Sequence, residues 1–255
     1  MRKRGQHFLV DRRISGRIAD YAYLTGSDSV LEVGPGTGNL TEVLSARAGR
    51  VVAVEVDPRL AAAMEGRFPN VSVIRGDALR VDLPEYDKVV SNLPYQISSK
   101  MTFRILEREF EVAVLMYQRE FAQRLVAPPG SKDYGRLSLN VGLRAEAEIL
   151  ERVPRTAFRP RPRVESAIVR LRPREDRPEV DERISVYLTR GLFSQRRKKV
   201  KKSLAAMGIS SKAISCMESD LLEKRPENLT PEEMVSLADA ISRNHRTGSV
   251  FYTHR

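Results

Sequence analysis

Short apolar runs alternate with amphipathic stretches over the first two thirds of the chain. The runs are rich in valine, isoleucine and leucine, and several are apolar at nearly every position, as expected for strands that are covered on both faces. They predict strands at residues 30–33, 51–56, 71–74, 88–91, 112–116, 147–153 and 167–171. Between them, apolar residues recur at helical spacing at 40–48, 59–67, 98–107, 119–126 and 136–143. This alternation predicts an α/β fold with a parallel sheet and helices on its faces.

A further helix is expected before the first strand, at residues 11–24, with Asp11 as its N-cap. Beyond Arg174 the chain becomes charged and proline-bearing, and no strand-like run follows. We therefore predict a boundary near residue 176, with a first domain at 1–176 and a small helical domain at 177–255. Helical spacing recurs at 182–193, 200–207 and 231–242, the last opened by a capping box of Thr230 and Glu233. The polar tail from Asn244 is expected to be mobile.

Charge and cysteine content narrow the kinds of partner and cellular compartment expected for the protein. The chain has 255 residues, and its 44 Lys and Arg against 33 Asp and Glu give a formal net charge of +11, which favours a polyanionic partner over a merely basic soluble protein. Cys216 is the only cysteine, which excludes an intramolecular disulfide and a cysteine-rich zinc site and fits a reducing, cytoplasmic setting. The three histidines are scattered, so no metal site is expected, and no apolar stretch approaches a membrane span.

The first motif with chemical content is Glu32-Val33-Gly34-Pro35-Gly36-Thr37-Gly38, which follows the first predicted strand of the sheet. Glycines at a strand-to-helix turn let the backbone approach a ligand without a Cβ in the way. The spacing is one residue shorter than the dinucleotide pattern Gly-x-Gly-x-x-Gly, so it favours a nucleoside cofactor without a pyrophosphate. The alternative is a purely structural turn.

Acidic residues follow the next two strands. Glu55 stands about twenty residues beyond the loop, where a carboxylate can accept both hydroxyls of a ribose, although Asp57 competes for that role. Asp77, in Gly76-Asp77-Ala78, could accept from the amino group of an adenine, or cap a helix instead.

The second motif, Asn92-Leu93-Pro94-Tyr95, follows the fourth predicted strand. An adenine amino nitrogen is a poor nucleophile because its lone pair is delocalised into the ring. Two acceptors on its N–H bonds, the Asn92 side-chain oxygen and a main-chain carbonyl of Leu93 or Pro94, would return that lone pair to the nitrogen, and Tyr95 offers a flat surface to the base. No general base is needed before attack. A lone Asn-x-Pro-Tyr is otherwise a proline turn, but with the first motif it indicates methyl transfer to a base.

Basic residues gather in two stretches. Eight arginines and one acid lie between Arg152 and Arg174, together with Phe158, and seven basic residues without an acid lie between Arg190 and Lys202. Both are candidate phosphate contacts, and an aromatic among arginines suits an unstacked RNA base. The alternatives are a proline-stiffened loop for the first stretch and a solvated helix face or localisation-like signal for the second.

These motifs together resemble the small-subunit ribosomal RNA adenine dimethyltransferases, and the resemblance covers nearly the whole chain. It is carried by the two motifs above with Gln96-Ile97-Ser98-Ser99, by Glu55 and Asp77, and by Gly5-Gln6-His7-Phe8-Leu9 and Phe158-Arg159-Pro160-Arg161-Pro162-Arg163-Val164-Glu165-Ser166. Gln96, Ser98, Ser99 and the run Arg196–Lys202 are most similar to archaeal or eukaryotic members.

The resemblance implies a Rossmann-like class I methyltransferase sheet, S-adenosylmethionine as the methyl donor, and no metal. It implies that His7, Leu9, Gly34, Glu55, Asp77 and Asn92 contact the donor, that Asn92, Leu93, Pro94 and Tyr95 hold the target adenine, and that Phe158 closes on the other face of the base. Many relatives carry Asn where this chain has His7, and either side chain can donate a hydrogen bond.

The expected reaction is dimethylation of N6 of two adjacent adenosines in the 3′-terminal hairpin loop of small-subunit rRNA, by a monomer coupled to ribosome biogenesis and acting on a pre-30S-type particle. Two alternatives stay open. One is a large-subunit rRNA adenine dimethyltransferase, against which the Phe158 segment and Gln96–Ser99 argue; DNA adenine methylation is more distant. The other is an assembly factor that acts mainly by binding pre-ribosomes, against which intact Asn92 and Glu55 argue.

Overall fold

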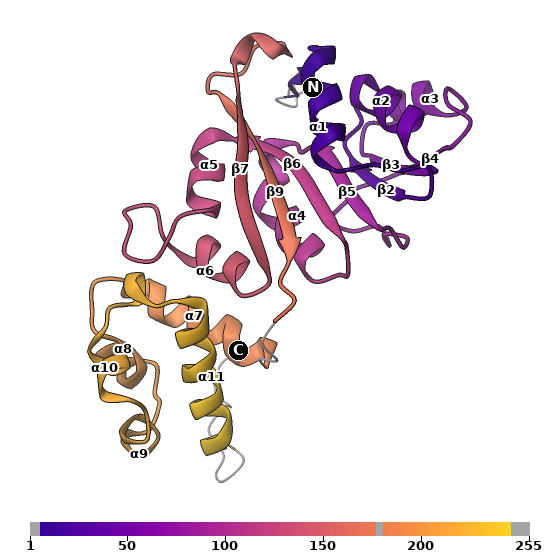
Figure 1. Cartoon of the computed structure of the whole chain (residues 1–255). Helices are drawn as coiled ribbons and strands as arrows, with labels where there is room; N and C mark the ends of the chain where they lie inside the picture. The colour runs from indigo at the N-terminus through magenta and orange to yellow at the C-terminus, as the bar shows by residue number, and fades with distance from the viewer. Residues whose placement is uncertain (1–5, 177–180, 246–255) are drawn as a thin grey trace. The chain divides into compact units, whose positions relative to one another are not determined.

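A computed structural model describes residues 6–176 and 181–245 of the chain (Figure 1). Gly5 of the N-terminal motif and the tail from residue 246 lie outside the described residues. The chain divides into two compact units, one running up to Val126 and including Ala145–Pro173, the other formed by Ala127–Arg144 and the chain from Arg174 onward. The predicted boundary near residue 176 is a single cut, whereas this division also assigns 127–144 to the second unit.

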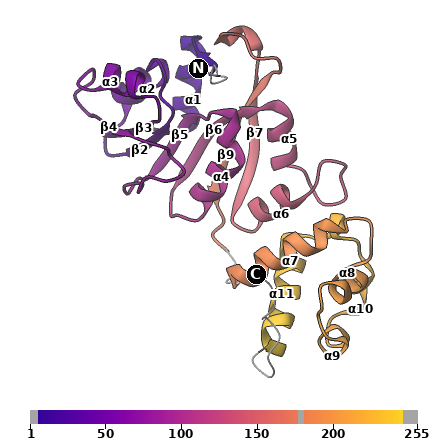
Figure 2. The ribbon, with the colours of Figure 1, turned by 180° about the vertical axis from the view of Figure 1, so that it is seen from behind.

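The first unit is built on a seven-stranded sheet with helices on both faces (Figures 1 and 2). Its elements are β1 (Phe8–Leu9), α1 (Arg12–Tyr21), β2 (Ser29–Val33), α2 (Asn39–Arg47), β3 (Arg50–Glu55), α3 (Pro58–Met64), β4 (Val71–Arg75), β5 (Lys88–Asn92), the 3₁₀ turn η1 (Tyr95–Ile97), α4 (Ser98–Leu106), β6 (Val112–Gln118), α5 (Arg119–Leu125), β7 (Ala145–Val153), the 3₁₀ turn η2 (Arg155–Ala157), β8 (Phe158–Arg159) and β9 (Ser166–Pro173). All the predicted strands and helices of this unit form.

The strand order is β4-β3-β2-β5-β6-β9-β7. The first five strands are parallel, but β9 runs antiparallel to both β6 and β7, so the expectation of a wholly parallel sheet is wrong at this edge. Parallel neighbours need a crossover connection, usually a helix, and only a short turn and β8 stand between Val153 and Ser166. The five parallel strands are unaffected by this antiparallel pairing. The carboxyl ends of β2, β3, β4 and β5 lie next to one another along one edge of the sheet.

Apolar burial explains why these segments form a sheet with helices on it. Val30, Val51, Val90 and Val114 are fully buried in one cluster, into which α1 and α2 insert residues such as Ile18. Asp11 begins α1 as predicted, accepting a hydrogen bond from the Arg13 backbone N–H at 2.9 Å. Because the strands are rigidly packed, the loops at their carboxyl ends are held in fixed positions.

The second unit is helical in its described part. It contains α6 (Arg136–Gly142), α7 (Glu182–Ser194), α8 (Val200–Ala206), α9 (Ser211–Ser215), α10 (Ser219–Glu223), the 3₁₀ turn η3 (Pro226–Asn228) and α11 (Pro231–His245). Its core includes Leu139, Leu188, Leu204 and Leu237. The capping box is confirmed, since Thr230 Oγ1 accepts from Glu233 N and Glu233 Oε2 from Thr230 N.

Hydrogen bonds explain why residues 127–144 belong to this unit. The Tyr134 hydroxyl donates to the Leu229 carbonyl at 2.6 Å, and Gly130 N donates to the Glu227 carbonyl at 2.7 Å. Leu139 and Leu143 lie in the same apolar cluster as the C-terminal helices. Helical spacing identified α6 but could not show which core it joins. Of the helices for which residues are described, none is long and apolar enough to cross a membrane.

Candidate active site

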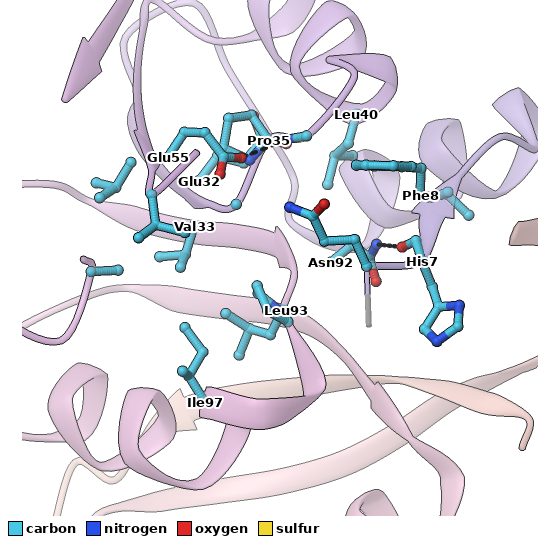
Figure 3. A pocket seen from close by; sticks show the side chains of 18 of the residues that line it. His7, Phe8, Glu32, Val33, Pro35, Leu40, Glu55, Asn92, Leu93 and Ile97 are labelled. Carbon is cyan, nitrogen blue, oxygen red and sulfur yellow. Dashed lines mark hydrogen bonds between the residues drawn. The ribbon is translucent and has the colours of Figure 1, made fainter. Parts of the chain in front are cut away.

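One cavity lies at the carboxyl ends of β2, β3, β4 and β5 (Figure 3). It is lined by the glycine loop after β2, by the ends of β3 and β4, by the second motif after β5, and by the N-terminal residues Gln6 to Leu9. The sheet therefore brings together segments that are far apart in the sequence. Every predicted site residue except Phe158 lines this cavity.

The glycine loop has a backbone that requires glycine. Gly34, Gly36 and Gly38 have φ values of 71°, 58° and 84°, which lie in the left-handed region that side-chain-bearing residues rarely adopt. A Cβ on Gly34 would lie 3.0 Å from Pro94 Cγ, so the first motif rests directly on the second. The two motifs thus form adjacent walls of one site.

The Glu55 side chain forms a hydrogen bond to the backbone of this loop. This side chain is 3% exposed, and its two oxygens accept hydrogen bonds from Gly36 N at 3.1 Å and from Asp57 N at 2.9 Å. Each carboxylate oxygen has two lone pairs, so both can still accept from a ligand hydroxyl in the cavity. Asp57, the competing candidate, caps α3 by accepting from Arg59 N at 3.0 Å and is absent from the lining of the cavity.

Asp77 lies in a turn after β4 and caps no helix there. It lines the cavity, and its Oδ1 accepts from Leu79 N at 2.9 Å, which fixes the turn after β4. Its other oxygen lies 3.6 Å from Arg80 Nε in an exposed ion pair, a contact of little strength in water. The carboxylate therefore keeps an acceptor for a ligand.

The N-terminal residues form a strap, which we define as His7, Phe8 and Leu9. β1 within it pairs antiparallel with β8, and the Leu9 carbonyl accepts from Asn39 Nδ2 at 2.7 Å. The Phe8 ring packs on the glycine loop, since a Cβ on Gly36 would lie 2.7 Å from Phe8 Cδ1. The strap thus closes one side of the cavity.

Asn92 is oriented by the strap. Its Nδ2 donates to the His7 main-chain carbonyl at 3.4 Å, the dashed contact in Figure 3. A carbonyl can only accept, so the amino end of the Asn92 amide must face His7, and Oδ1 is left as the acceptor. Among the described residues no group donates to that oxygen. Asn92 Oδ1 is therefore left to accept a hydrogen bond from a ligand in the cavity.

Leu93, Pro94 and Tyr95 of the second motif differ in the contacts they make. The Pro94 carbonyl already accepts from Ile97 N at 3.0 Å and from Ser98 Oγ at 3.5 Å, which uses both of its lone pairs. No hydrogen bond to the Leu93 carbonyl is formed by the described residues. The Tyr95 ring lines the cavity, and burial raises the pKa of its phenol. The remaining main-chain acceptor beside Asn92 is therefore that of Leu93.

Phe158 does not lie at the cavity. It is 1% exposed and packs in the apolar cluster that contains Leu9, Met116 and Ile168. As part of β8 it pairs with Leu9 of the strap. The structure thus makes Phe158 a support of the strap, and its predicted contact with a target base would require it to leave this core.

Glu32 was assigned no role from the sequence, although it begins the first motif. It lines the cavity, is 2% exposed, and its Oε2 has no hydrogen-bond partner. Burial, with a further contribution from the Glu55 charge, raises the pKa of this carboxyl to about 8. A buried polar atom without a partner is unfavourable unless a ligand supplies one.

Both basic stretches contain cations that are already paired within the protein. In the first, Arg170 pairs with Glu148, and Arg174 pairs with Asp176 and Glu232. The arginines at 152–163 are exposed and form no ion pair with the described residues: Arg152, Arg155, Arg159, Arg161 and Arg163. In the second stretch Arg196 is bound to Glu227 and to the carbonyls of Ser131 and Lys132, and Lys199 pairs with Glu223. No cluster of metal-ligating side chains occurs in the parts of the chain that the structure describes.

The parallel sheet, the glycine loop after β2, the acid at the end of β3 and the amide motif after β5 define the class: a Rossmann-like class I methyltransferase. A family model described as ribosomal RNA adenine dimethylase matches residues 1–242. The chain belongs to this family, and it is an rRNA adenine N6,N6-dimethyltransferase.

Individual relatives agree with the family. Probable ribosomal RNA small subunit methyltransferase A of Methanosarcina acetivorans is 48% identical, covering 92% of this chain and 91% of the relative. The protein of the same name from Methanothermobacter thermautotrophicus is 48% identical over 94% and 90%. Among solved structures, a dimethyladenosine transferase from Plasmodium falciparum is similar with a TM-score of 0.85 and 29% identity, covering 92% of this chain and 98% of that one. The 23S rRNA methyltransferase ErmE has a TM-score of 0.69 and 31% identity, over 92% and 99%.

Proposed function

We propose that the protein transfers methyl groups from S-adenosylmethionine to N6 of two adjacent adenosines in the 3′-terminal hairpin loop of small-subunit rRNA. The relatives named above as small-subunit enzymes support this choice of rRNA. We further propose that it acts as a cytoplasmic monomer on an assembling small subunit, so that methylation is coupled to ribosome biogenesis.

The cavity fits this donor. The glycine loop leaves room for a ligand, and Glu55 and Asp77 keep acceptors for the ribose hydroxyls and the adenine amino group. The unpartnered Glu32 oxygen is an acceptor for the donor's α-ammonium group, and His7, Leu9 and Gly34 complete the walls. When bound, S-adenosylmethionine supplies a methyl group on a positively charged sulfur, which needs no metal to become electrophilic.

The orientation of the Asn92 amide carries the proposal. Asn92 Oδ1 and the Leu93 carbonyl accept the two N–H bonds of the target amino group, which restores nucleophilic character to its nitrogen. Gly34 against Pro94 holds this acceptor pair beside the donor half of the cavity, so that catalysis consists of placement and polarisation. Tyr95 stacks on the base, which is extruded from its neighbours; stacking of this kind contributes roughly 1–3 kcal/mol per base.

Two measurements test the proposal. First, N6-dimethyladenosine is mapped in both ribosomal RNAs of cells with and without the protein; loss confined to the small-subunit hairpin is expected. Loss in the large-subunit RNA would favour the rival substrate, which the similarity to ErmE keeps in view.

Second, Asn92→Ala should abolish methylation in vitro while RNA binding stays near normal. Turnover equal to the wild type would refute the role of Asn92, and an assembly role without chemistry would leave cells carrying Asn92→Ala with normal ribosome assembly.

A further inference from the structure

The hydroxyl of Tyr95 is anchored by a strand that contributes no residue to the cavity. Tyr95 lies in η1 directly after Asn92, Leu93 and Pro94, and its phenolic oxygen is 2.7 Å from Ser166 Oγ. Ser166 is the first residue of β9 and is fully buried. It stands in register with Gln118 of β6 and Val153 of β7, so the backbone that carries its hydroxyl is fixed on both sides.

The hydrogen bond between Ser166 and Tyr95 is important because the second aromatic residue predicted to contact the base does not line the cavity. Phe158 lies in the core, so of the two aromatic residues predicted to hold the base it is Tyr95 that lines the cavity. A ring attached only through its own backbone can turn about its side-chain torsions, whereas a hydrogen bond at the far end fixes both ends of the ring. The His7 ring lies 5.8 Å away at a tilt of 33°, which is close enough to limit motion on one side without holding the hydroxyl.

We propose that Ser166 is a positioning residue of the methyl transfer, which holds the Tyr95 ring at the angle at which a stacked adenine presents its amino group to Asn92 Oδ1. This inference rests on the proposed function and adds to it a residue from a distant strand. Burial raises the pKa of the phenol, which favours its neutral form. Ser166 touches neither base nor donor, and its effect passes through Tyr95 alone.

The test is a double-mutant cycle with Tyr95→Phe, Ser166→Ala and the double variant, measured for methylation of the RNA hairpin. Each single change removes the same hydrogen bond from a different end. Each should lower kcat by roughly fivefold, the scale of one neutral hydrogen bond, and the double variant should lose no more than a single one. Affinity for S-adenosylmethionine should be unchanged, because the two hydroxyls bond to each other and Ser166 does not line the cavity.

The chain offers a matched control. Tyr117 and Thr102 form another buried hydroxyl pair at 2.7 Å in the same unit, with neither residue lining the cavity. Tyr117→Phe should lower thermal stability comparably and leave kcat within twofold. The inference is overturned if Ser166→Ala keeps the kcat of the wild type, if its loss equals that of Tyr117→Phe, or if the losses of the two single variants add. Should Ser166→Ala not fold, Tyr95→Phe with an unaltered kcat overturns it alone. Failure of the proposed function would be seen separately, as methylation that survives Asn92→Ala.

Discussion

Gly36→Ala should weaken donor binding, and the structure allows the size of the effect to be worked out. Gly36 has a φ of 58°, and an alanine there bears roughly 1–2 kcal/mol of left-handed backbone strain. Its Cβ would also lie 2.7 Å from Phe8 Cδ1 and 2.9 Å from Phe8 Cε1, so the ring has to move. Overpacking of this kind costs about 1–3 kcal/mol.

The overpacking cost should weaken donor binding more than it lowers the free energy of unfolding. The free protein can relieve the contact by shifting the strap away from the loop, because Phe8 is only half-buried and borders the cavity. Donor binding then either proceeds without the strap or returns the ring to its place at that cost. At about 1.4 kcal/mol per factor of ten, Kd for S-adenosylmethionine should rise by roughly 5- to 150-fold.

Gly66→Ala is the matched control for this change. Gly66 has a φ of 68°, and a Cβ there would meet nothing within 4 Å, so it carries the backbone strain without the contact. Calorimetric titration with S-adenosylmethionine should give a Kd for Gly66→Ala close to that of the wild type, while urea unfolding shows its loss of stability. Equal affinities of the two variants would refute the argument that the Phe8 ring rests on Gly36.

Two further outcomes follow from charges in the structure. Burial raises the pKa of Glu32 from 4.5 to about 8, so the folded state binds the proton more tightly than the unfolded state, and stability should fall as pH rises from about 5 to 8, by up to about 1.4 kcal/mol per pH unit. Urea unfolding at several pH values should show this slope, and Glu32→Gln should flatten it; an unchanged slope in the variant contradicts the assignment to Glu32. In the second basic stretch, four exposed cations are replaced with glutamine: Arg197, Lys198, Lys201 and Lys202. The salt dependence of RNA binding should then fall by about 0.7–0.9 in log–log slope per lost phosphate contact. Arg196→Gln, which breaks the 2.8 Å pair with Glu227, should lower the melting temperature instead; a large change in salt slope there would show that this arginine contacts RNA.

Local patterns were sufficient to predict most of the fold. Apolar runs located every strand of the large sheet, because buried strands need such residues whatever their neighbours, and Asp11 and Thr230 marked helix starts through short-range hydrogen bonds. The direction of β9 and the unit to which α6 belongs were not predictable in this way, since both depend on contacts between residues far apart in the sequence. The short strands β1 and β8 carry no periodicity and exist only because they pair with each other.

The candidate site likewise contains residues that the sequence predicted and residues whose place it could not predict. Side-chain identity placed Glu55, Asp77 and Asn92 at the cavity, because the ends of neighbouring parallel strands share one edge. It did not show where Phe158 lies, because an apolar ring suits a core as well as a stacked base. In the structure this ring is buried in the apolar cluster and does not line the cavity. Side-chain identity also gave Glu32 no role, although its position before the glycine loop is the signal that could have identified it.

What sequence reasoning could not supply is the part played by the main-chain carbonyls of the strap, because every residue carries such a group and no motif records it. The His7 carbonyl sets the orientation of the Asn92 amide, and the Leu9 carbonyl, held by Asn39 Nδ2, keeps the strap that bears it in place. The glycine loop therefore contributes to the base half of the site as well as to the donor half, since α2 begins directly after it with Asn39. A change that displaces the strap, as expected for Gly36→Ala, should then disturb Asn92 as well. The loss in kcat of that variant should accordingly exceed what saturating donor can restore, whereas a kcat fully recovered at high donor concentration would show that the strap serves the donor alone.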